Sequence, residues 1–196
     1  IHLYQWYFAY PFEQPQQDAL LYYTKLAGIS TTVKNNIINA YTSSMTTFDQ
    51  NLPGFTSKED AYRAYMQDQN YVWGCNQWKC DQGVMFINMN KYNLDAGNAT
   101  NYTNAASGYL HGMDGVNPLT HVYLSNMSSY GAENSVLEFY NSWYHDGSAL
   151  WDRVGTSTYG PAPGFVPGGP NPSYNWDGCC PNGCGSPQNN SLCYSI

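Results

Sequence analysis

The spacing of apolar residues predicts that the first part of the chain is helical. Residues 18–27 form a short amphipathic stretch closed by Gly28, which is typical of a helix end. The clearest helix follows Ser30, a residue type that caps helix N-termini. Its apolar residues recur every four positions, at Val33, Ile37, Tyr41 and Met45, with Ile38 beside them. We expect these side chains to face a core.

Three further segments complete the predicted helical part. Asn51–Phe55 contains Pro and Gly and predicts a turn, and Ser57–Asp60 resembles a capping box that starts a helix. In that helix Ala61, Tyr65 and Met66 would face inward. Another helix should run from Trp73 to about Tyr92, with Val84, Phe86, Ile87 and Met89 as its apolar residues, and a last one from Asn101 to Gly112.

The pattern changes after residue 114. One short alternating stretch, His121–Leu124, predicts a strand, and the rest is rich in Gly, Pro and aromatic residues. Residues 159–174 contain too many Pro and Gly for a helix, yet they carry aromatic side chains that a flexible linker lacks. We therefore expect one all-α domain over residues 1–196, helical at 1–113 and loop-rich at 114–196. Antiparallel helical hairpins with loops on one rim are typical of an α-helical toroid.

Composition narrows the range of partners. Only 11% of residues are charged, against about 25% in a typical domain. The net charge is −7 and no basic cluster occurs, so we expect no nucleic-acid partner. No apolar run reaches the length of a membrane span, which predicts a soluble chain without membrane insertion. Nineteen Tyr and six Trp among neutral polar residues suit a hydroxyl-rich ligand such as sugar, although a tyrosine-rich core would explain them equally well.

The cysteines favour an oxidising compartment. Cys179, Cys180, Cys184 and Cys193 cluster in the loop-rich part. Disulfides suit them better than zinc, because adjacent cysteines rarely both bind one tetrahedral ion and no His lies near. Cys75 and Cys80 are five residues apart, and their pairing is left open. Glycosylation sequons occur at Asn98, Asn101, Asn126 and Asn189, a number close to chance for this composition.

Three ordered segments resemble family-nine glycoside hydrolases, the (α/α)6-barrel cellulases. Tyr71–Gln77 (YVWGCNQ) resembles the Trp-Gly-rich start of a barrel helix, and Tyr109–Leu119 (YLHGMDGVNPL) resembles the Gly-x-Asn-Pro-Leu turn of that family. Phe165–Asn171 (FVPGGPN) is similar to its Val-Gly-Gly-Pro loop. The resemblance extends from about Gln14 to the end and favours a secreted bacterial branch. It implies the C-terminal half of such a barrel, with its rim loops stapled by disulfides.

The resemblance implies an inverting endo-β-1,4-glucanase. An Asp base would activate water and a Glu acid would protonate the leaving oxygen, with the two carboxyl groups about 6.5–9.5 Å apart. Neither of the corresponding motifs occurs in the sequence, so we expect no catalytic residue in this chain and no hydrolysis by it alone. The start without Met also suggests a processed or truncated end. The partners would then be β-glucan and the remainder of the same catalytic domain.

Substrate contacts are what the resemblance assigns to this chain. Trp73 matches a groove tryptophan that stacks on a glucosyl ring, and Gln77 stands where relatives often carry an Arg. A His-His-Arg motif of the family is missing. Its positional counterpart is the segment that contains Trp143, Tyr144 and His145, followed by Trp151, and we expect these residues to supply equivalent contacts.

Plainer roles compete with several of these assignments. His145 is more often a hydrogen-bonded loop residue than an acid or base, and Asp146 with Asp152 suits caps or turns as well as a carboxylate pair. His111 fits a structural place at a helix C-terminus, and Glu138 is expected to face solvent. Asn171 and Asp177 are candidate ligands for a structural calcium ion, without EF-hand spacing. A non-catalytic carbohydrate-binding or structural extracellular protein is the alternative function.

Overall fold

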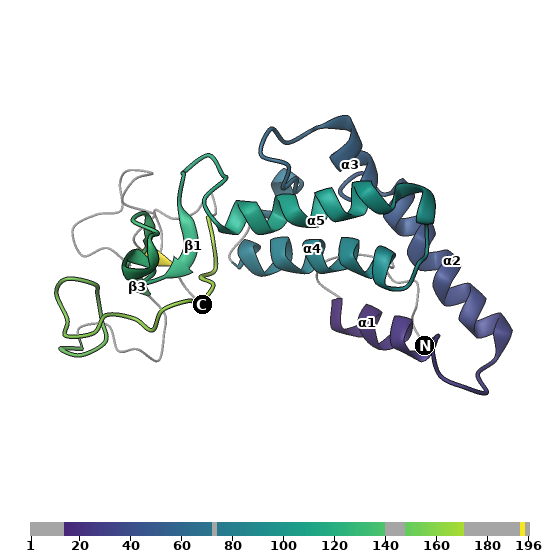
Figure 1. Cartoon of the computed structure of the whole chain (residues 1–196), viewed down its shortest axis with the longest axis horizontal. Coiled ribbons are helices and arrows are strands. Elements are labelled where there is room, and N and C mark those ends of the chain that lie inside the picture. Colours follow the sequence, from purple (N-terminus) through teal and green to yellow (C-terminus); the bar gives the residue numbers. More distant parts are fainter. Residues whose placement is uncertain (1–13, 72–73, 140–147, 171–192, 195–196) are drawn as a thin grey trace. The chain divides into compact units, whose positions relative to one another are not determined.

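The computed structural model describes residues 14–71, 74–139, 148–170 and 193–194 (Figure 1). The chain divides into two compact units, which are considered separately. The first comprises residues 1–65 and 78–110, and the second comprises residues 66–77 and 111–196. Two of the three boundaries, after residues 77 and 110, fall inside helices, so the second unit includes short helical ends as well as the loop-rich residues.

The first unit contains most of the helical residues, which confirms the all-α prediction for the described part of the chain. The helices are α1 (Gln14–Tyr23), α2 (Thr31–Thr47), α3 (Leu52–Ser57), α4 (Cys75–Lys91) and α5 (Ala99–Met113). Short 3-10 turns occur at η2 (Asp68–Asn70) and η3 (Ala96–Asn98). Helix α1 begins four residues before the predicted start and is followed by a turn that reaches Gly28, whose φ is +75°.

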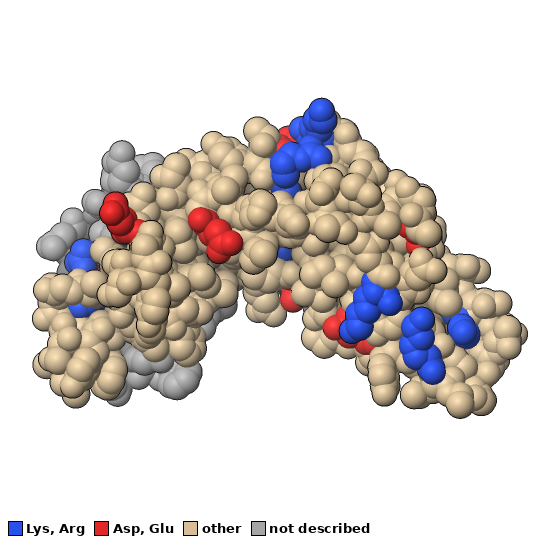
Figure 2. Space-filling view, viewed as in Figure 1, with Lys and Arg blue, Asp and Glu red and all other residues tan. Residues whose placement is uncertain are grey.

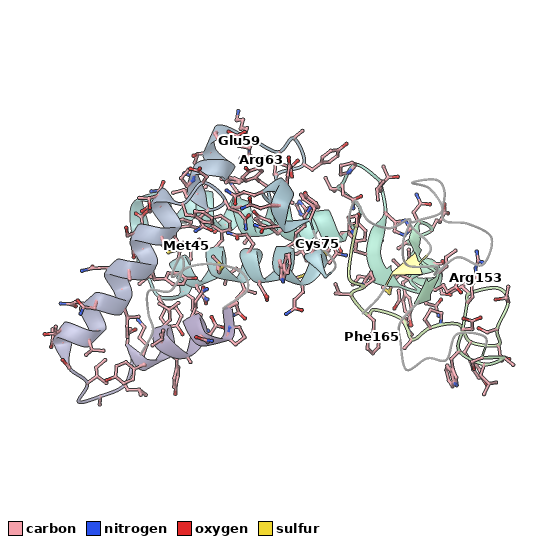
Figure 3. The ribbon with its side chains drawn as sticks, turned by 180° about the vertical axis from the view of Figure 1, so that it is seen from behind. Met45, Glu59, Arg63, Cys75, Arg153 and Phe165 are labelled. Carbon is pink, nitrogen blue, oxygen red and sulfur yellow. The ribbon has the colours of Figure 1, made fainter. Side chains whose placement is uncertain are left out.

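Helix α2 follows the predicted pattern with one exception. The Ser30 hydroxyl accepts the Val33 N–H as an N-cap, and Ile37, Tyr41 and Met45 are buried (Figure 3 labels Met45). Val33 was expected to face the core, but its side chain is exposed. It lies in the first turn of the helix, before the packed surface begins. The regular spacing of apolar residues therefore predicted the buried face of α2 correctly, but it extended that face one turn too far toward the N-terminus.

The two predictions between α2 and α4 were wrong. Residues 51–55 do not form a turn, because helix α3 begins at Leu52 with Pro53 in its first turn. Proline is accepted there since the missing N–H would have no helical partner in any case. Ser57 ends this helix, with Lys58 in a left-handed conformation (φ +60°). The carboxylate of Asp60 then accepts the N–H groups of residues 62 and 64, which fixes a loop in place of the predicted helix.

Helices α4 and α5 lie side by side and form the centre of the first unit's core (Figure 1). The ring centroid of Phe86 lies 6.0 Å from the ring centroid of Tyr109 and 6.2 Å from that of Tyr102. Gly108 of α5 packs against the backbone of Arg63, where a Cβ atom would meet the carbonyl oxygen. Ile87 was expected to be buried, but it is exposed on the opposite face of α4.

Buried amides join helices within the first unit. The Gln82 amide donates to Asn51 Oδ1 at 2.6 Å, and Gln50 donates to Gln82 Oε1 at 3.3 Å. Elsewhere Asn88 donates to Asp18 Oδ1 at 2.6 Å. Buried polar side chains with partners cost little stability and fix the register of neighbouring helices, since a lost partner would leave a desolvated amide.

The second unit is built from loops with short parallel strand pairs. Strand β1 (Val122–Ser125) pairs with β2 (Ser135–Val136), and β3 (Glu138–Phe139) pairs with β4 (Cys193–Tyr194). The 3-10 turn η4 (Ser128–Tyr130) separates the first two strands. Strand β1 confirms the predicted strand within one residue. Among the described residues, no helix is long and apolar enough to cross a membrane.

Candidate functional site

The first turn of α4 belongs to the second unit and contains Cys75, Asn76 and Gln77, the end of the Tyr71–Gln77 segment. Gly74 precedes it with φ +88°, and its carbonyl accepts the Gln77 N–H at 3.1 Å. Cys75 and Asn76 are fully buried, whereas the Gln77 side chain is exposed. Cys75 and Asn76 therefore anchor the start of α4, and the Gln77 side chain is exposed to solvent.

Asn76 connects this helix start to the Gly-Gly-Pro loop, more than ninety residues further along. Its N–H donates to the Gly168 carbonyl at 3.0 Å, and its side-chain amide donates to the Pro167 carbonyl at 3.1 Å. The Cys75 thiol lies 2.9 Å from the Pro170 carbonyl oxygen (Cys75 is labelled in Figure 3). Gly169 has φ +93°, and a Cβ atom there would lie 2.5 Å from Asn76 Oδ1. The Tyr71–Gln77 and Phe165–Asn171 segments thus contact each other through their described residues.

Asn117, from the third of those segments, fixes the turn after α5. Its buried side-chain amide donates to the carbonyls of Gly112 and His121 at 2.8 and 2.7 Å. Its Oδ1 accepts the N–H groups of Leu119 and His121 at 3.1 and 3.2 Å. All the hydrogen-bonding positions of one amide are used inside the turn, so the residue has a structural role there.

Ser125 and Asn126 hold the Gly-Pro-Ala-Pro-Gly loop against β1. The Ser125 hydroxyl donates to the Ala162 carbonyl and accepts the Phe165 N–H, and the Ser125 N–H donates to the Phe165 carbonyl (Phe165 is labelled in Figure 3). The Asn126 amide donates to the carbonyls of Tyr159 and Pro161 at 3.1 and 2.8 Å. A loop without regular structure is therefore tied to the strand through several hydrogen bonds.

Residues 148–160 form a hydrogen-bonded loop that presents two aromatic rings, and we name this segment the aromatic loop. Its two sides are joined by Tyr159 N–H to the Leu150 carbonyl at 2.8 Å and by Thr158 N–H to the Ala149 carbonyl at 3.0 Å. The rings of Trp151 and Tyr159 stack with their centroids 4.7 Å apart and their planes 31° from parallel. The two side chains are 42% and 60% exposed.

Strand β3 anchors this aromatic loop. The Val154 N–H donates to the Leu137 carbonyl at 3.1 Å, and Glu138 forms an isolated backbone bridge with Arg153. Glu138 Oε2 also lies 3.8 Å from Arg153 Nε. Glu138 was expected to face solvent, but its side chain is only 14% exposed because it packs beside this cation (Arg153 is labelled in Figure 3).

The structure locates two of the six predicted substrate-binding residues. Gln77 and Trp151 both belong to the second unit and both are exposed, and no hydrogen bond or ring contact joins these two described side chains. Trp73, Trp143, Tyr144 and His145 lie outside the described residues, as do the calcium-ligand candidates Asn171 and Asp177. Sequence reasoning missed Tyr159 as the stacking partner of Trp151 and Asn76 as the anchor of the Gly-Gly-Pro loop.

The titratable groups with altered acidity have structural causes. Burial, followed by the charge of Asp81, raises the pKa of Cys80, which keeps that thiol protonated and weakly reactive. Hydrogen bonds from Asn98 and then Tyr102 lower the pKa of Asp95. Among described residues, no three His, Cys, Asp or Glu side chains gather to hold a metal ion, and Cys75 and Cys80 are not bridged to each other.

Comparison of the chain with family models, with curated proteins and with solved structures gives no match.

Proposed function

We propose that this chain is part of a secreted glycoside hydrolase that cleaves β-1,4-glucan with inversion, similar to family-nine cellulases. The observation that carries the proposal is the contact of Asn76 with the Pro167–Pro170 loop. Two segments chosen for their resemblance to one family lie against each other, although ninety residues separate them. A chance resemblance in two segments would not require such a contact. The helices then belong to an (α/α)6 barrel, and the cysteine cluster supplies disulfides in its rim.

In this proposal the chain binds substrate and does not supply the acid or the base. Gln77 is exposed at the start of α4, where its amide is available to a sugar hydroxyl. The one Asp-Ala-Gly segment, at Asp95, continues with an Asn and serves as a turn before α5. Its carboxylate accepts hydrogen bonds from Asn98 and Tyr102, and its lowered pKa makes it a weak base. The catalytic carboxylates would come from the remainder of the domain.

The test compares the 196-residue chain with the full-length gene product on soluble β-1,4-glucan. We expect the full-length product to release reducing ends, and NMR of the first products to give the α-anomer, because inversion of a β-linkage produces it. The 196-residue chain should release none. Absence of hydrolysis by the full-length product, or retention of the β-anomer, would contradict the proposal.

A second candidate is a non-catalytic carbohydrate-binding protein. It is favoured by the exposed rings of Trp151 and Tyr159, which would hold a sugar without any acid or base. Glucan binding by the full-length product without the release of reducing ends would select this second function.

A further inference from the structure

We infer that residues 22–34, where α1 ends and α2 begins, dock the protein onto an anionic lipid surface. We name this segment the basic corner. It carries exposed apolar side chains between lysines and contains no acidic residue. The inference goes beyond the proposed hydrolysis and is independent of it, because it uses no residue of the second unit. It needs no membrane span, since the basic corner would lie among the headgroups of one leaflet.

Three large apolar side chains of the basic corner are exposed to solvent. Tyr22, Leu26 and Val33 are 63%, 46% and 39% exposed. Single exposed apolar residues need no explanation, whereas three in one short segment suggest a contact surface. At Gly28, between them, a Cβ atom would have no neighbour within 4 Å, so the turn is open to solvent there.

The backbone places an apolar residue and a lysine on one face of the turn after α1. The Lys25 N–H donates to the Tyr22 carbonyl at 2.9 Å, and the Leu26 N–H donates to the carbonyl of residue 23 at 3.1 Å. Side chains three residues apart in such a turn point the same way, so Tyr22 and Lys25 share the outer face. Leu21 and Thr24 are buried on the inner face. The basic corner is therefore anchored from inside before any ligand binds.

The charge of the basic corner is opposite to that of the whole chain. The chain has a net charge of −7, yet no Asp or Glu occurs between Asp18 and Asp49, whereas Lys25 and Lys34 both do. Figure 2 shows Lys and Arg side chains, in blue, gathered over α1 and the neighbouring end of α2. A local positive potential in an acidic protein attracts anionic partners to that end alone.

Lys91 adds a cation from the last turn of α4. The Nζ atoms of Lys25 and Lys91 lie 5.3 and 5.4 Å from the centroid of the same ring, that of Tyr92. The ring is buried, so the lysine stems cover it while their ammonium groups stay in water. Among the described residues, neither lysine takes part in an ion pair. Two neighbouring cations without a counter-charge leave their charge available to an anionic surface.

The mixture of side chains favours a lipid surface over an acidic protein. Anionic headgroups attract the lysines, and the boundary of the acyl chains accepts Leu26 and Val33. Tyr22 has an apolar ring and a polar hydroxyl, which suits the interface between them. A protein partner would need hollows that match these exposed side chains, whereas lipids rearrange around them.

The test is co-sedimentation of the 196-residue chain with vesicles of equal parts phosphatidylglycerol and phosphatidylcholine, and with vesicles of phosphatidylcholine alone. We expect binding to the anionic vesicles only, weakened by added sodium chloride because salt screens the attraction. Lys25→Gln and Lys34→Gln should each weaken the partition coefficient about fivefold, the loss expected for one lysine near an anionic surface. Leu26→Gln should weaken it about tenfold, because apolar contact with the acyl boundary is lost.

Matched controls come from the same unit. Lys58→Gln removes an exposed lysine at the end of α3, and Leu110→Gln removes an apolar side chain that is 61% exposed on α5. Both should bind as the wild type. Lys25→Arg should also bind as the wild type, because it keeps the charge. Circular dichroism and thermal melts of each variant distinguish lost binding from lost folding.

Four outcomes would overturn the inference. The first is absence of binding to the anionic vesicles, and the second is equal binding to phosphatidylcholine alone. The third is the same partition coefficient for Lys25→Gln, Leu26→Gln and the two controls. The fourth is binding to immobilised poly-L-glutamate, lost in Lys25→Gln, without binding to vesicles, which would assign the basic corner to an acidic protein. None of these measurements involves glucan, so failure here and failure of the proposed hydrolysis are distinguished.

Discussion

The contact between Asn76 and Gly169 predicts that Gly169→Ala destabilises the second unit. Two effects add in this variant. An Ala residue at φ +93° costs about 1–2 kcal/mol, because its Cβ atom clashes with its own backbone in the left-handed region. The same Cβ would lie 2.5 Å from Asn76 Oδ1 and 2.8 Å from Nδ2, so the buried amide has to move. Its hydrogen bond to the Pro167 carbonyl is then lost, which costs about 1–3 kcal/mol.

Gly164 provides a matched control for this prediction. Its φ is +84° and no atom lies within 4 Å of the Cβ position, so Gly164→Ala costs only the backbone strain of about 1–2 kcal/mol. We therefore expect Gly169→Ala to exceed Gly164→Ala by about 1–3 kcal/mol in guanidinium denaturation. In an Asn76→Ala background the excess should disappear, because the atoms that clash are gone.

Hydrogen exchange gives a local measurement of the same change. The Asn76 N–H donates to the Gly168 carbonyl, so its exchange should be faster in Gly169→Ala and unchanged in Gly164→Ala. Equal destabilisation by both variants, or an excess that persists without the Asn76 side chain, would refute the contact of the Gly-Gly-Pro loop with the start of α4. It would also remove the observation that carries the proposed function.

Three further predictions concern other parts of the fold. Gly108→Ala should destabilise the first unit by about 1–3 kcal/mol, because its Cβ atom would overlap the Arg63 backbone. Gly83→Ala on α4 should be neutral or stabilising, because Ala favours a helix and its Cβ atom would make only ordinary contacts. Equal melting temperatures of the two variants would contradict this packing. Asn117→Asp should lower the free energy of unfolding by about 2–4 kcal/mol, because two buried carbonyls lose their donors and face a carboxylate. If the variant unfolded at the same denaturant concentration as the wild type, the turn would not need the amide. For Asp95, whose pKa lies below its usual value of 3.8, the carboxylate stabilises the fold at neutral pH and this contribution is lost as pH falls through the lowered pKa. Asp95→Asn should therefore have a lower melting temperature than the wild type at pH 7 and the same melting temperature in strong acid. A difference in melting temperature that grows as the pH falls would contradict this prediction.

Local patterns were sufficient for the long helices. Helix α2 has a cap at Ser30 and three buried residues at regular spacing, and α5 has a similar apolar face, so sequence alone located both. The pattern of apolar and polar residues gave a wrong prediction where the local sequence is compatible with two structures. Pro53 is compatible with a turn and with the first turn of a helix, and only packing of Leu52 and Phe55 on the core selected the helix.

In the candidate site, too, the sequence predicted some residues and missed those whose partners are set by tertiary contacts. Trp151 was predicted as a substrate contact because it follows the segment that stands in the place of the His-His-Arg motif of family-nine glycoside hydrolases. Tyr159 was not connected to it, since the two are eight residues apart in a segment without periodic structure. Their stacking follows from the backbone pairing of residues 149–150 with 158–159, which is a tertiary fact. Asn76 was missed for the same reason, because its partners lie ninety residues away.

Asn126 has a consequence for how the protein is made. It stands in an Asn-Met-Ser sequon, and both hydrogens of its side-chain amide are engaged, by the carbonyls of Tyr159 and Pro161. A glycan attached to that nitrogen would replace one of the two hydrogens, so at most one of the two bonds would survive. Oligosaccharide transfer before the loop closes therefore competes with its closure, whereas a closed loop shields the acceptor. The order of these two events in a eukaryotic expression host would decide whether the aromatic loop is assembled.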